Sequence, residues 1–140
     1  MINKELICNR LDLIHRSLAR LKKMSSLSLE QFLEEPDNFA VAEHHLRRAL
    51  ESLFDIGRHI MAKKGLGHPT DYRSILLTLG REKILPREFV QRIKGMAGYR
   101  NRLVHGYAEV TPEEMYRILK TRLSDFEEFC IYILKYLDEI

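Results

Sequence analysis

The chain has 140 residues, of which 45% are apolar and 31% charged, and a formal net charge of +3. These values are typical of one globular domain with its own core, spanning residues 1–140, and exclude a low-complexity protein. No apolar run is long enough to cross a bilayer and the first residues do not resemble a signal peptide, so we expect a cytoplasmic protein without membrane contact.

The first half of the chain predicts two long helices and a short one. Apolar residues at alternating spacings of four and three mark the first long helix. Ser28 opens a short helix with a capping box, and Pro36 starts or kinks the next one. A second apolar stripe ends at Gly65, which follows two lysines and favours a helix C-terminus. The stripes comprise Ile7, Leu11, Ile14, Leu18 and Leu21, then Phe39, Ala42, Leu46, Ala49, Leu53, Ile56 and Ile60.

The second half of the chain predicts a shorter helix and two further long ones. Thr70 or Asp71 caps the shorter helix. Pro86 fits the first turn of the next helix, whose apolar series is Phe89, Ile93, Met96, Leu103 and Tyr107. The last helix begins at Thr111, with Glu114 completing a capping box, and its stripe runs from Met115 to Leu137. We therefore predict an all-α fold, an antiparallel helical bundle of four long helices plus one or two short helices.

The two cysteines lie near opposite ends of the chain, inside helical segments. Nothing in a helical cytoplasmic protein requires Cys8 and Cys130 to pair. We interpret both as small buried apolar residues.

The stretch GYRNRLVHGY, residues 98–107, combines unusual positions. Arg100 occupies a place in the apolar series between Met96 and Leu103 where a core residue is expected. A charge there must be paired or must face something other than core. Asn101 and His105 are four residues apart and share a helix face. Gly106 allows a left-handed cap that would expose His105 at the helix end.

A structural explanation of the same stretch stays open. His105 can interact with the C-terminal end of the helix dipole. Arg100 can extend its charged head to a carboxylate, with Glu51 or Asp55 as the candidates. The segment from Arg81 to Arg102 is locally basic, which suits phosphate binding but equally suits a solvated helix face. Its basic residues are Arg81, Lys83, Arg87, Arg92, Lys94, Arg100 and Arg102, against Glu82 and Glu88.

The sequence RNRLVHGY resembles the R-x-x-x-x-H-x-Y signature of the HEPN superfamily, in its branch of HepT-like toxins. Arg100, His105 and Tyr107 match the three signature positions, and Asn101 matches the polar residue that follows the arginine. The resemblance extends to RALESLFDIGRHI, DYRSILLTLGREKIL and TPEEMYRIL, and so covers nearly the whole chain.

This resemblance implies a HEPN-like homodimer in which two motifs meet in a basic cleft. It implies the ribonuclease toxin of a HEPN/MNT toxin–antitoxin pair of type VII, which cleaves RNA without a metal or other cofactor. It also implies a cognate minimal nucleotidyltransferase (MNT) antitoxin of the MntA type, which silences the toxin by transferring AMP to Tyr107. The catalytic residues are then expected to be Arg100, His105 and Asn101.

The residues suit that chemistry. The ribose 2′-hydroxyl of RNA is its own nucleophile, and histidine moves protons near neutral pH. Arginine presents a planar fork of donors to a phosphate. One motif carries one histidine, so a symmetric pair of motifs would supply both an acid and a base.

Further candidates lie outside the motif. Glu51, Asp55 and Arg58 are possible cleft-lining or supporting residues, as is Arg102; alternatively, the residues of the second helix pair with one another on a solvated face. A metal site built from Asp55, His59 and His44 or His45 lacks any zinc-type spacing, so none is expected. The alternative function is a non-catalytic HEPN subunit that binds a nucleotide or its nucleotidyltransferase partner.

Overall fold

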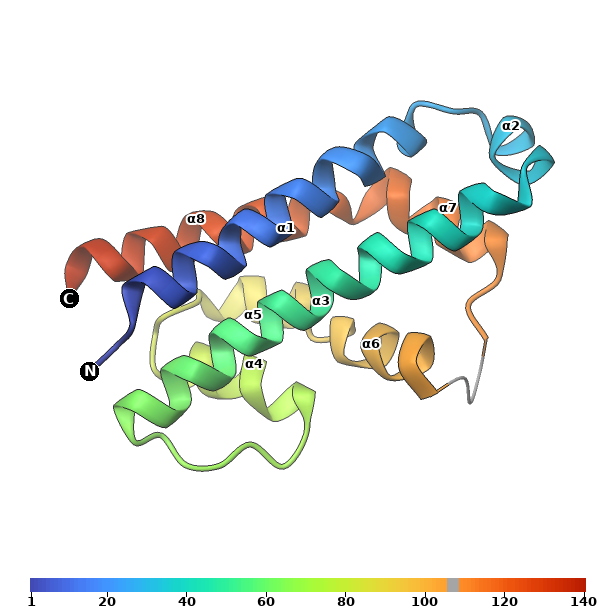
Figure 1. Cartoon of the computed structure of the whole chain (residues 1–140). Helices are drawn as coiled ribbons and strands as arrows, with labels where there is room; N and C mark the ends of the chain where they lie inside the picture. The colour runs from blue at the N-terminus through green and yellow to red at the C-terminus, as the bar shows by residue number, and fades with distance from the viewer. Residues whose placement is uncertain (106–108) are drawn as a thin grey trace.

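The computed structural model describes residues 1–105 and 109–140, and within them the backbone is helical with no strand (Figure 1). The all-α prediction is confirmed. No helix in the described ranges is long and apolar enough to span a membrane. The helices are α1 Lys4–Ser25, α2 Leu29–Glu34, α3 Pro36–Lys64, α4 Tyr72–Arg81, α5 Arg87–Ile93, α6 Met96–His105, α7 Pro112–Thr121 and α8 Leu123–Glu139.

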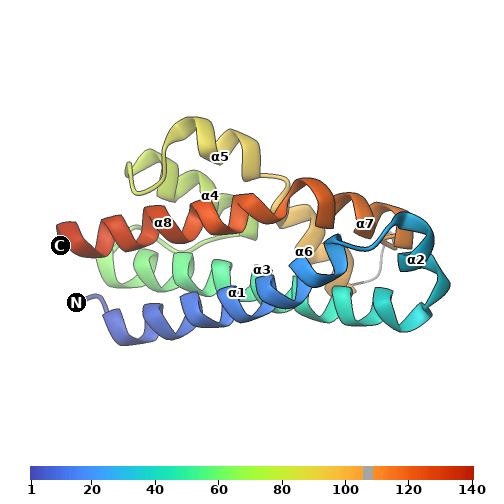
Figure 2. The same ribbon diagram turned by 90° about the horizontal axis from the view of Figure 1, so that it is seen from above.

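The longest helices form the body of the bundle. Helix α1 packs along α3 in the opposite direction, and α8 packs along α1 (Figure 2). The stripe residues of the first helix, from Ile7 to Leu21, are all buried, as are those of the last, from Met115 to Leu137. Burial of one apolar face on each helix therefore builds a single core.

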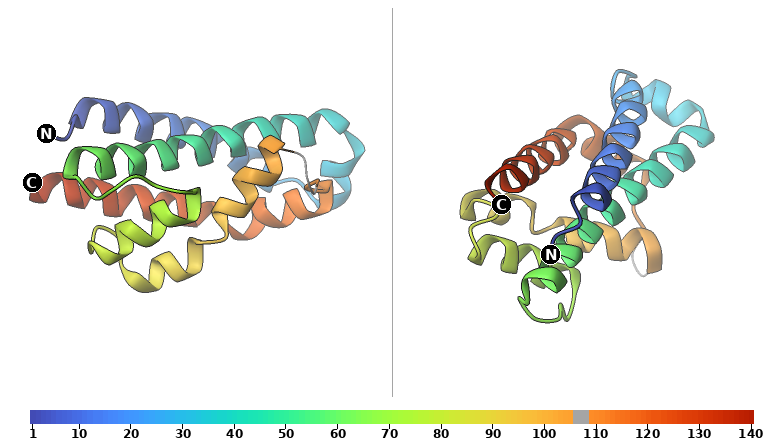
Figure 3. Two further views of the ribbon diagram at one scale, coloured as in Figure 1. Left: turned by 90° about the horizontal axis from the view of Figure 1, so that it is seen from below. Right: turned by 60° about the vertical axis from the view of Figure 1, so that its left-hand side comes forward.

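The shorter helices α4, α5 and α6 lie together against one side of this body (Figure 3). Helices α4 and α6 both contact α3, and they also contact each other. A Cβ built at Gly57 of α3 would come within 2.4 Å of Ile75 Cγ2 on α4. Only a glycine lets these two helices approach so closely, and α3 thereby fixes the position of α4 next to α6.

The predicted caps are mostly confirmed. Ser28 and Gln31 form the capping box of α2, and Asp71 forms another with Ser74 at the start of α4. Gly65 ends α3 with φ +64°, in the left-handed region that favours glycine. Pro86 lies at the N-cap of α5 rather than in its first turn.

Two of the four predicted long helices are each divided in two. The helix expected from Pro86 breaks at Lys94 and Gly95, so that α5 ends at Ile93 and α6 begins at Met96. The Gly95 carbonyl accepts from the N–H groups of residues 98 and 99, which makes it the start of a new helix. The last expected helix breaks at Arg122, where φ is −118°, between α7 and α8. Residues on both sides of each break remain buried, so the apolar stripe continues across the break and did not reveal it.

The cysteine prediction is right for one residue and wrong for the other. Cys130 is buried, and its burial raises the pKa of the thiol to about 12. Cys8 is exposed. It directly follows the buried Ile7, and one residue along an α-helix turns the side chain about 100° away from the stripe.

Candidate functional site

Arg100 lies in the middle of α6 and faces the start of α4. Its Cζ atom is 4.3 Å from the centroid of the Tyr72 ring. Its Nε atom is buried and has no hydrogen-bond partner among residues 1–105 and 109–140. The Tyr72 ring packs in turn on Phe54 of α3, with the ring centroids 4.9 Å apart. A half-buried guanidinium is thus held by an aromatic face, which stabilises its charge without neutralising it.

The carboxylates proposed as partners of Arg100 do not pair with it. Asp55 contacts Arg10 at 3.4 Å and Arg58 at 3.5 Å. Glu51 is exposed on α3, with no ion pair in the described part of the chain. The interpretation of Arg100 as paired with Glu51 or Asp55 is therefore wrong. The aromatic ring of α4 lies where a carboxylate was expected.

Arg58 is the one supporting candidate that the structure brings to Arg100. Its Cζ atom is 5.5 Å from the centroid of the same Tyr72 ring, and Asp55 is its neighbour. Two cations therefore share one tyrosine. His59 points elsewhere: its Nε2 accepts a hydrogen bond of 3.0 Å from the Asn3 N–H, and burial lowers the pKa of its imidazole.

The remaining motif residues lie along α6 and beyond it. Asn101 is exposed. His105 is the last residue of α6, and its backbone is described. Gly106 and Tyr107 lie outside the described residues, so the predicted left-handed cap and the position of the tyrosine stay predictions.

Arg102 faces away from Arg100 and joins α6 to α7. Its guanidinium donates to both carboxylate oxygens of Glu114 at 2.7 Å and to the backbone carbonyl of Glu109 at 3.0 Å. The hydrogen bond from Arg102 lowers the pKa of Glu114. Thr111 does cap α7, accepting from the Glu114 N–H, but the predicted capping box is wrong because the Glu114 side chain is used by Arg102.

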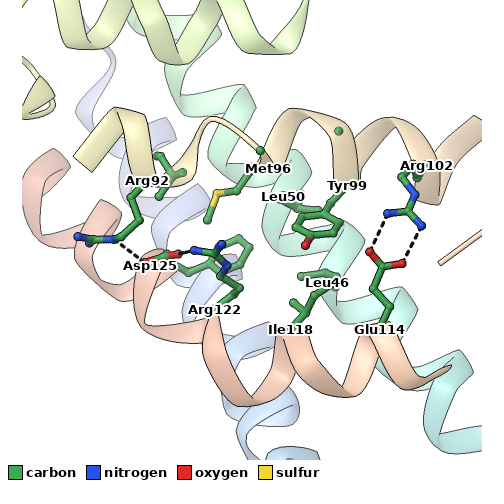
Figure 4. Close-up of a pocket in the computed structure, with 14 residues that line it drawn as sticks. Leu46, Leu50, Arg92, Met96, Tyr99, Arg102, Glu114, Ile118, Arg122 and Asp125 are labelled. Carbon is green, nitrogen blue, oxygen red and sulfur yellow. Dashed lines mark hydrogen bonds and ion pairs between the residues drawn. The ribbon is translucent and has the colours of Figure 1, made fainter. Parts of the chain in front are cut away.

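A pocket of about 290 Å³ lies between α6 and α7, next to this ion pair (Figure 4). The Tyr99 ring points into it above an apolar floor that includes Leu46 and Ile118. At the far end, the buried Asp125 carboxylate accepts from Arg92 Nε at 3.1 Å and pairs with Arg122 at 3.4 Å. Arginines and carboxylates neutralise one another here, in contrast to Arg100 on the other side of α6.

Sequence reasoning missed the aromatic support of the motif. No spacing rule links Tyr72, the first residue of α4, to an arginine 28 positions later. The only local signal was the cap at Asp71, which determined where α4 begins but not which residue of another helix its first side chain would meet.

An all-α bundle that carries an arginine, an asparagine and a histidine in this order on one short helix has the features of the HEPN class of helical domains. The sequence matches the family described as ribonuclease HepT-like over residues 14–133. The chain therefore belongs to the ribonuclease HepT-like family.

Two relatives align over almost the whole chain. The tRNA nuclease HepT of Aphanizomenon flos-aquae is 30% identical over 136 residues, which is 97% of this chain and 92% of that protein. The mRNA nuclease HepT of Shewanella oneidensis is 26% identical over 127 residues, 89% of this chain and 93% of that protein.

Solved structures share the fold. The tri-AMPylated Shewanella oneidensis HEPN toxin, solved in complex with its MNT antitoxin, superposes with a TM-score of 0.84 at 26% identity, covering 93% of this chain and 97% of that one. The cytosolic protein YutE of Bacillus subtilis, whose function is unknown, superposes with a TM-score of 0.85 at 20% identity, covering 99% and 92% of the two chains. The second likeness concerns the fold alone.

Proposed function

We propose that this protein is the endoribonuclease toxin of a HEPN/MNT toxin–antitoxin pair and that it cleaves RNA without a metal ion. Family membership and the two nuclease relatives support this activity. The observation that carries the assignment of the site is the state of Arg100. Its guanidinium rests on Tyr72 with no carboxylate partner among residues 1–105 and 109–140, so its charge is available to an RNA phosphate.

The proposed reaction uses the RNA's own 2′-hydroxyl. A histidine takes the proton from that hydroxyl, and the 2′-oxygen forms a bond to the adjacent phosphorus. The bond from phosphorus to the 5′-oxygen breaks, and the leaving oxygen takes a proton from an acid. The products are a 2′,3′-cyclic phosphate and a 5′-hydroxyl. Arg100 stabilises the additional negative charge on the phosphorus centre, and Asn101 orients the imidazole or holds a phosphate oxygen.

The base and the acid are proposed to be the His105 residues of two copies of the chain. Each copy supplies a single motif, and general acid–base cleavage needs two groups with proton affinities near neutral pH. A homodimer with adjoining motifs meets that requirement.

Regulation is proposed to act on Tyr107, through AMP transfer by a cognate MNT antitoxin. A phosphodiester on the tyrosine would place a bulky anion two residues from His105, where it would compete with RNA phosphate for Arg100. The AMPylated state of the Shewanella oneidensis HEPN toxin supports this proposal. Intact-mass measurement of the wild type and of Tyr107→Phe, after incubation with antitoxin and ATP, tests it. Added AMP on the wild type alone is expected, and equal mass gain on Tyr107→Phe would refute the assignment.

The activity is tested by incubating purified protein with total RNA in EDTA and mapping the fragment ends. Wild-type protein is expected to leave 2′,3′-cyclic phosphates, and His105→Ala is expected to cut roughly 100- to 10,000-fold more slowly. His68→Ala, in an exposed loop, is the matched control and should cut at the wild-type rate.

The same experiment distinguishes the enzyme from a non-catalytic partner subunit. If dimeric protein free of AMP does not cleave RNA but still binds the nucleotidyltransferase, the nuclease proposal is wrong. The protein is then the non-catalytic binding subunit. Equal cleavage by wild type and His105→Ala would instead indicate a contaminating nuclease.

A further inference from the structure

A cationic pocket lies at the opposite end of the α4–α6 layer from the motif. The turn between α4 and α5 forms one wall and the C-terminal half of α8 forms the other, around a volume of about 370 Å³. Figure 2 shows both segments at the end of the molecule that carries the chain termini, whereas α6 runs away from that end. We call this site the α4–α8 pocket; its basic and aromatic residues are Arg81, Lys83, Arg87, Tyr132, Lys135 and Tyr136.

The four cations of the α4–α8 pocket are exposed, and none makes an ion pair or a side-chain hydrogen bond within the described ranges. Among the described residues, Glu139 is the only acidic one in the lining. Three arginines elsewhere are instead paired: Arg92 and Arg122 with Asp125, and Arg102 with Glu114. Four cations against one carboxylate around one hollow create a local positive potential that attracts a polyanion.

The aromatic rings of the pocket favour a nucleic acid over a simple anion. Tyr132 is half-buried, packs on Phe89 with centroids 5.0 Å apart, and donates to Glu128 at 3.4 Å. Glu128 is itself paired with Arg92 at 2.5 Å, so it does not offset the pocket's cations. The Tyr136 hydroxyl has no hydrogen-bond partner in the described part of the chain. Fixed tyrosine faces between cations are the arrangement on which bases of single-stranded nucleic acids stack.

The backbone at Lys83 adds an independent observation. Its φ is +61°, in the left-handed region that glycine occupies most easily. The turn closes through hydrogen bonds from the Lys83 N–H to the Gly80 carbonyl and from the Ile84 N–H to the Leu79 carbonyl, the pattern that ends many helices at a glycine. A lysine here is not what the turn itself favours, and its side chain adds a cation to the pocket.

We propose that the α4–α8 pocket binds a single-stranded segment of RNA remote from the site of cleavage, with phosphates on Lys83 and Lys135 and a base on Tyr136. This inference rests on the proposed function in that it takes the bound RNA to be the nuclease's substrate. The remote contact then positions the strand that extends from the motif.

Binding is measured by fluorescence anisotropy in a His105→Ala background, which prevents cleavage, with labelled single-stranded RNA over a range of salt concentrations. The double variant Lys83→Gln/Lys135→Gln is compared with Lys23→Gln/Lys64→Gln, which removes two exposed lysines outside the pocket. Loss of two phosphate contacts should lower the log–log salt slope by about 1.4 and weaken binding roughly 5- to 25-fold at 0.1 M salt. The control pair should leave both quantities almost unchanged.

Two further variants separate charge, stacking and folding. Lys83→Gly should weaken RNA binding while the melting temperature stays equal or rises, since glycine suits φ +61°. Tyr136→Leu should weaken binding of RNA but not of inorganic polyphosphate, which has no bases to stack.

The outcomes are distinct from those of the cleavage assay. If both double lysine variants weaken RNA binding equally, the effect is one of net charge, and the proposed RNA site in the α4–α8 pocket is wrong. If the pocket variants bind RNA as the wild type does but lose binding to the acidic polymer polyglutamate, the proposed RNA site is also wrong. The pocket would then bind an acidic protein partner. A third outcome separates the two proposals. If the wild type does not cleave RNA, the proposed nuclease activity is wrong. If, in the same protein, RNA binding is lost in the pocket variants and kept in the control pair, the pocket is still an RNA site.

Discussion

Single residues decide how the motif keeps its charge. Arg100 stands in an apolar series, and an unpaired buried charge is costly. Tyr72 offsets that cost through its ring face, and the guanidinium makes no ion pair with the part of the chain that the structure describes. A carboxylate in the same place would have held Arg100 more firmly but would have cancelled the charge proposed to act on phosphate.

Replacing Tyr72 tests this positioning role, given the proposed function. Tyr72→Leu keeps an apolar side chain but removes the ring face, which contributes about 0.5–2 kcal/mol, so cleavage should slow roughly 2- to 30-fold. Tyr72→Phe keeps the ring and should cut at nearly the wild-type rate. The measurement is kcat and KM for RNA cleavage, together with the melting temperature. A rate loss in Tyr72→Phe equal to that in Tyr72→Leu would contradict the role of the ring.

The ion pair between Arg102 and Glu114 predicts a pH dependence of stability. Arg102 lowers the pKa of Glu114 below its ordinary value of 4.5, so the pair stabilises the folded state above that value and this contribution is lost as pH falls through the lowered pKa. Glu114→Gln should reduce the free energy of unfolding by about 1 kcal/mol at neutral pH. Urea titrations measure the free energy of unfolding of both proteins, and the two values should converge at low pH. A difference in unfolding free energy that stays constant down to pH 2 would contradict the prediction.

At the scale of elements, α6 depends on its neighbours for its position. It is a short helix that begins at Met96, and among its described side chains only those of Met96 and Ala97 are buried. Tyr99 and Leu103 pack partly buried against the core. Arg100 contacts Tyr72 of α4, and Arg102 forms an ion pair with α7. Since α4 is placed by its close approach to α3 at Gly57, the geometry of the motif depends on that crossing.

Gly57→Ala should therefore disturb both stability and the motif. The new methyl group would meet Ile75 Cγ2, on a stiff β-branched side chain, at 2.4 Å. We expect a loss of about 1–2 kcal/mol in the free energy of unfolding, because overpacking outweighs the gain in helix propensity. Gly98→Ala is the matched control in α6, where an added Cβ meets nothing within 4 Å, and it should be neutral or stabilising. Chemical denaturation measures both, and equal effects would contradict the close-packing argument.

At the scale of the whole molecule, charge is distributed unevenly. Within the layer of α4–α6, Arg100 and the cations of the α4–α8 pocket make no ion pair in the described part of the chain, whereas Arg92 and Arg102 are paired. The same layer lies on one side of the helical body (Figure 3). The motif and the α4–α8 pocket, the two regions where RNA is proposed to bind, therefore both include residues of this layer.

The proposed dimeric active unit predicts a mixing behaviour. If one cleavage event needs His105 from both copies, dimers formed randomly from wild type and His105→Ala should lose activity as the square of the wild-type fraction. The chains are refolded together and assayed at fixed total concentration, and light scattering should give twice the 16.5 kDa chain mass. A linear decrease in activity would show that one histidine suffices.

The sequence by itself determined the helices, their apolar faces and most of their caps. Those properties depend on residues a few positions apart, as at Ser28, Asp71 and Gly65. It also determined the family, because the motif is contiguous. It did not reveal the breaks at Gly95 and Arg122, where the apolar stripe continues across the turn, nor that Cys8 is exposed.

Only the tertiary structure decided what surrounds the motif. The contacts of Arg100 with Tyr72 and of Arg102 with Glu114 join different helices, and so does the pocket between the α4–α5 turn and α8. A helical pattern states which face of a helix is buried but not which side chain of another helix it meets. That pairing follows from how closely the helices approach one another, as at Gly57, and this approach is a property of the packed core as a whole.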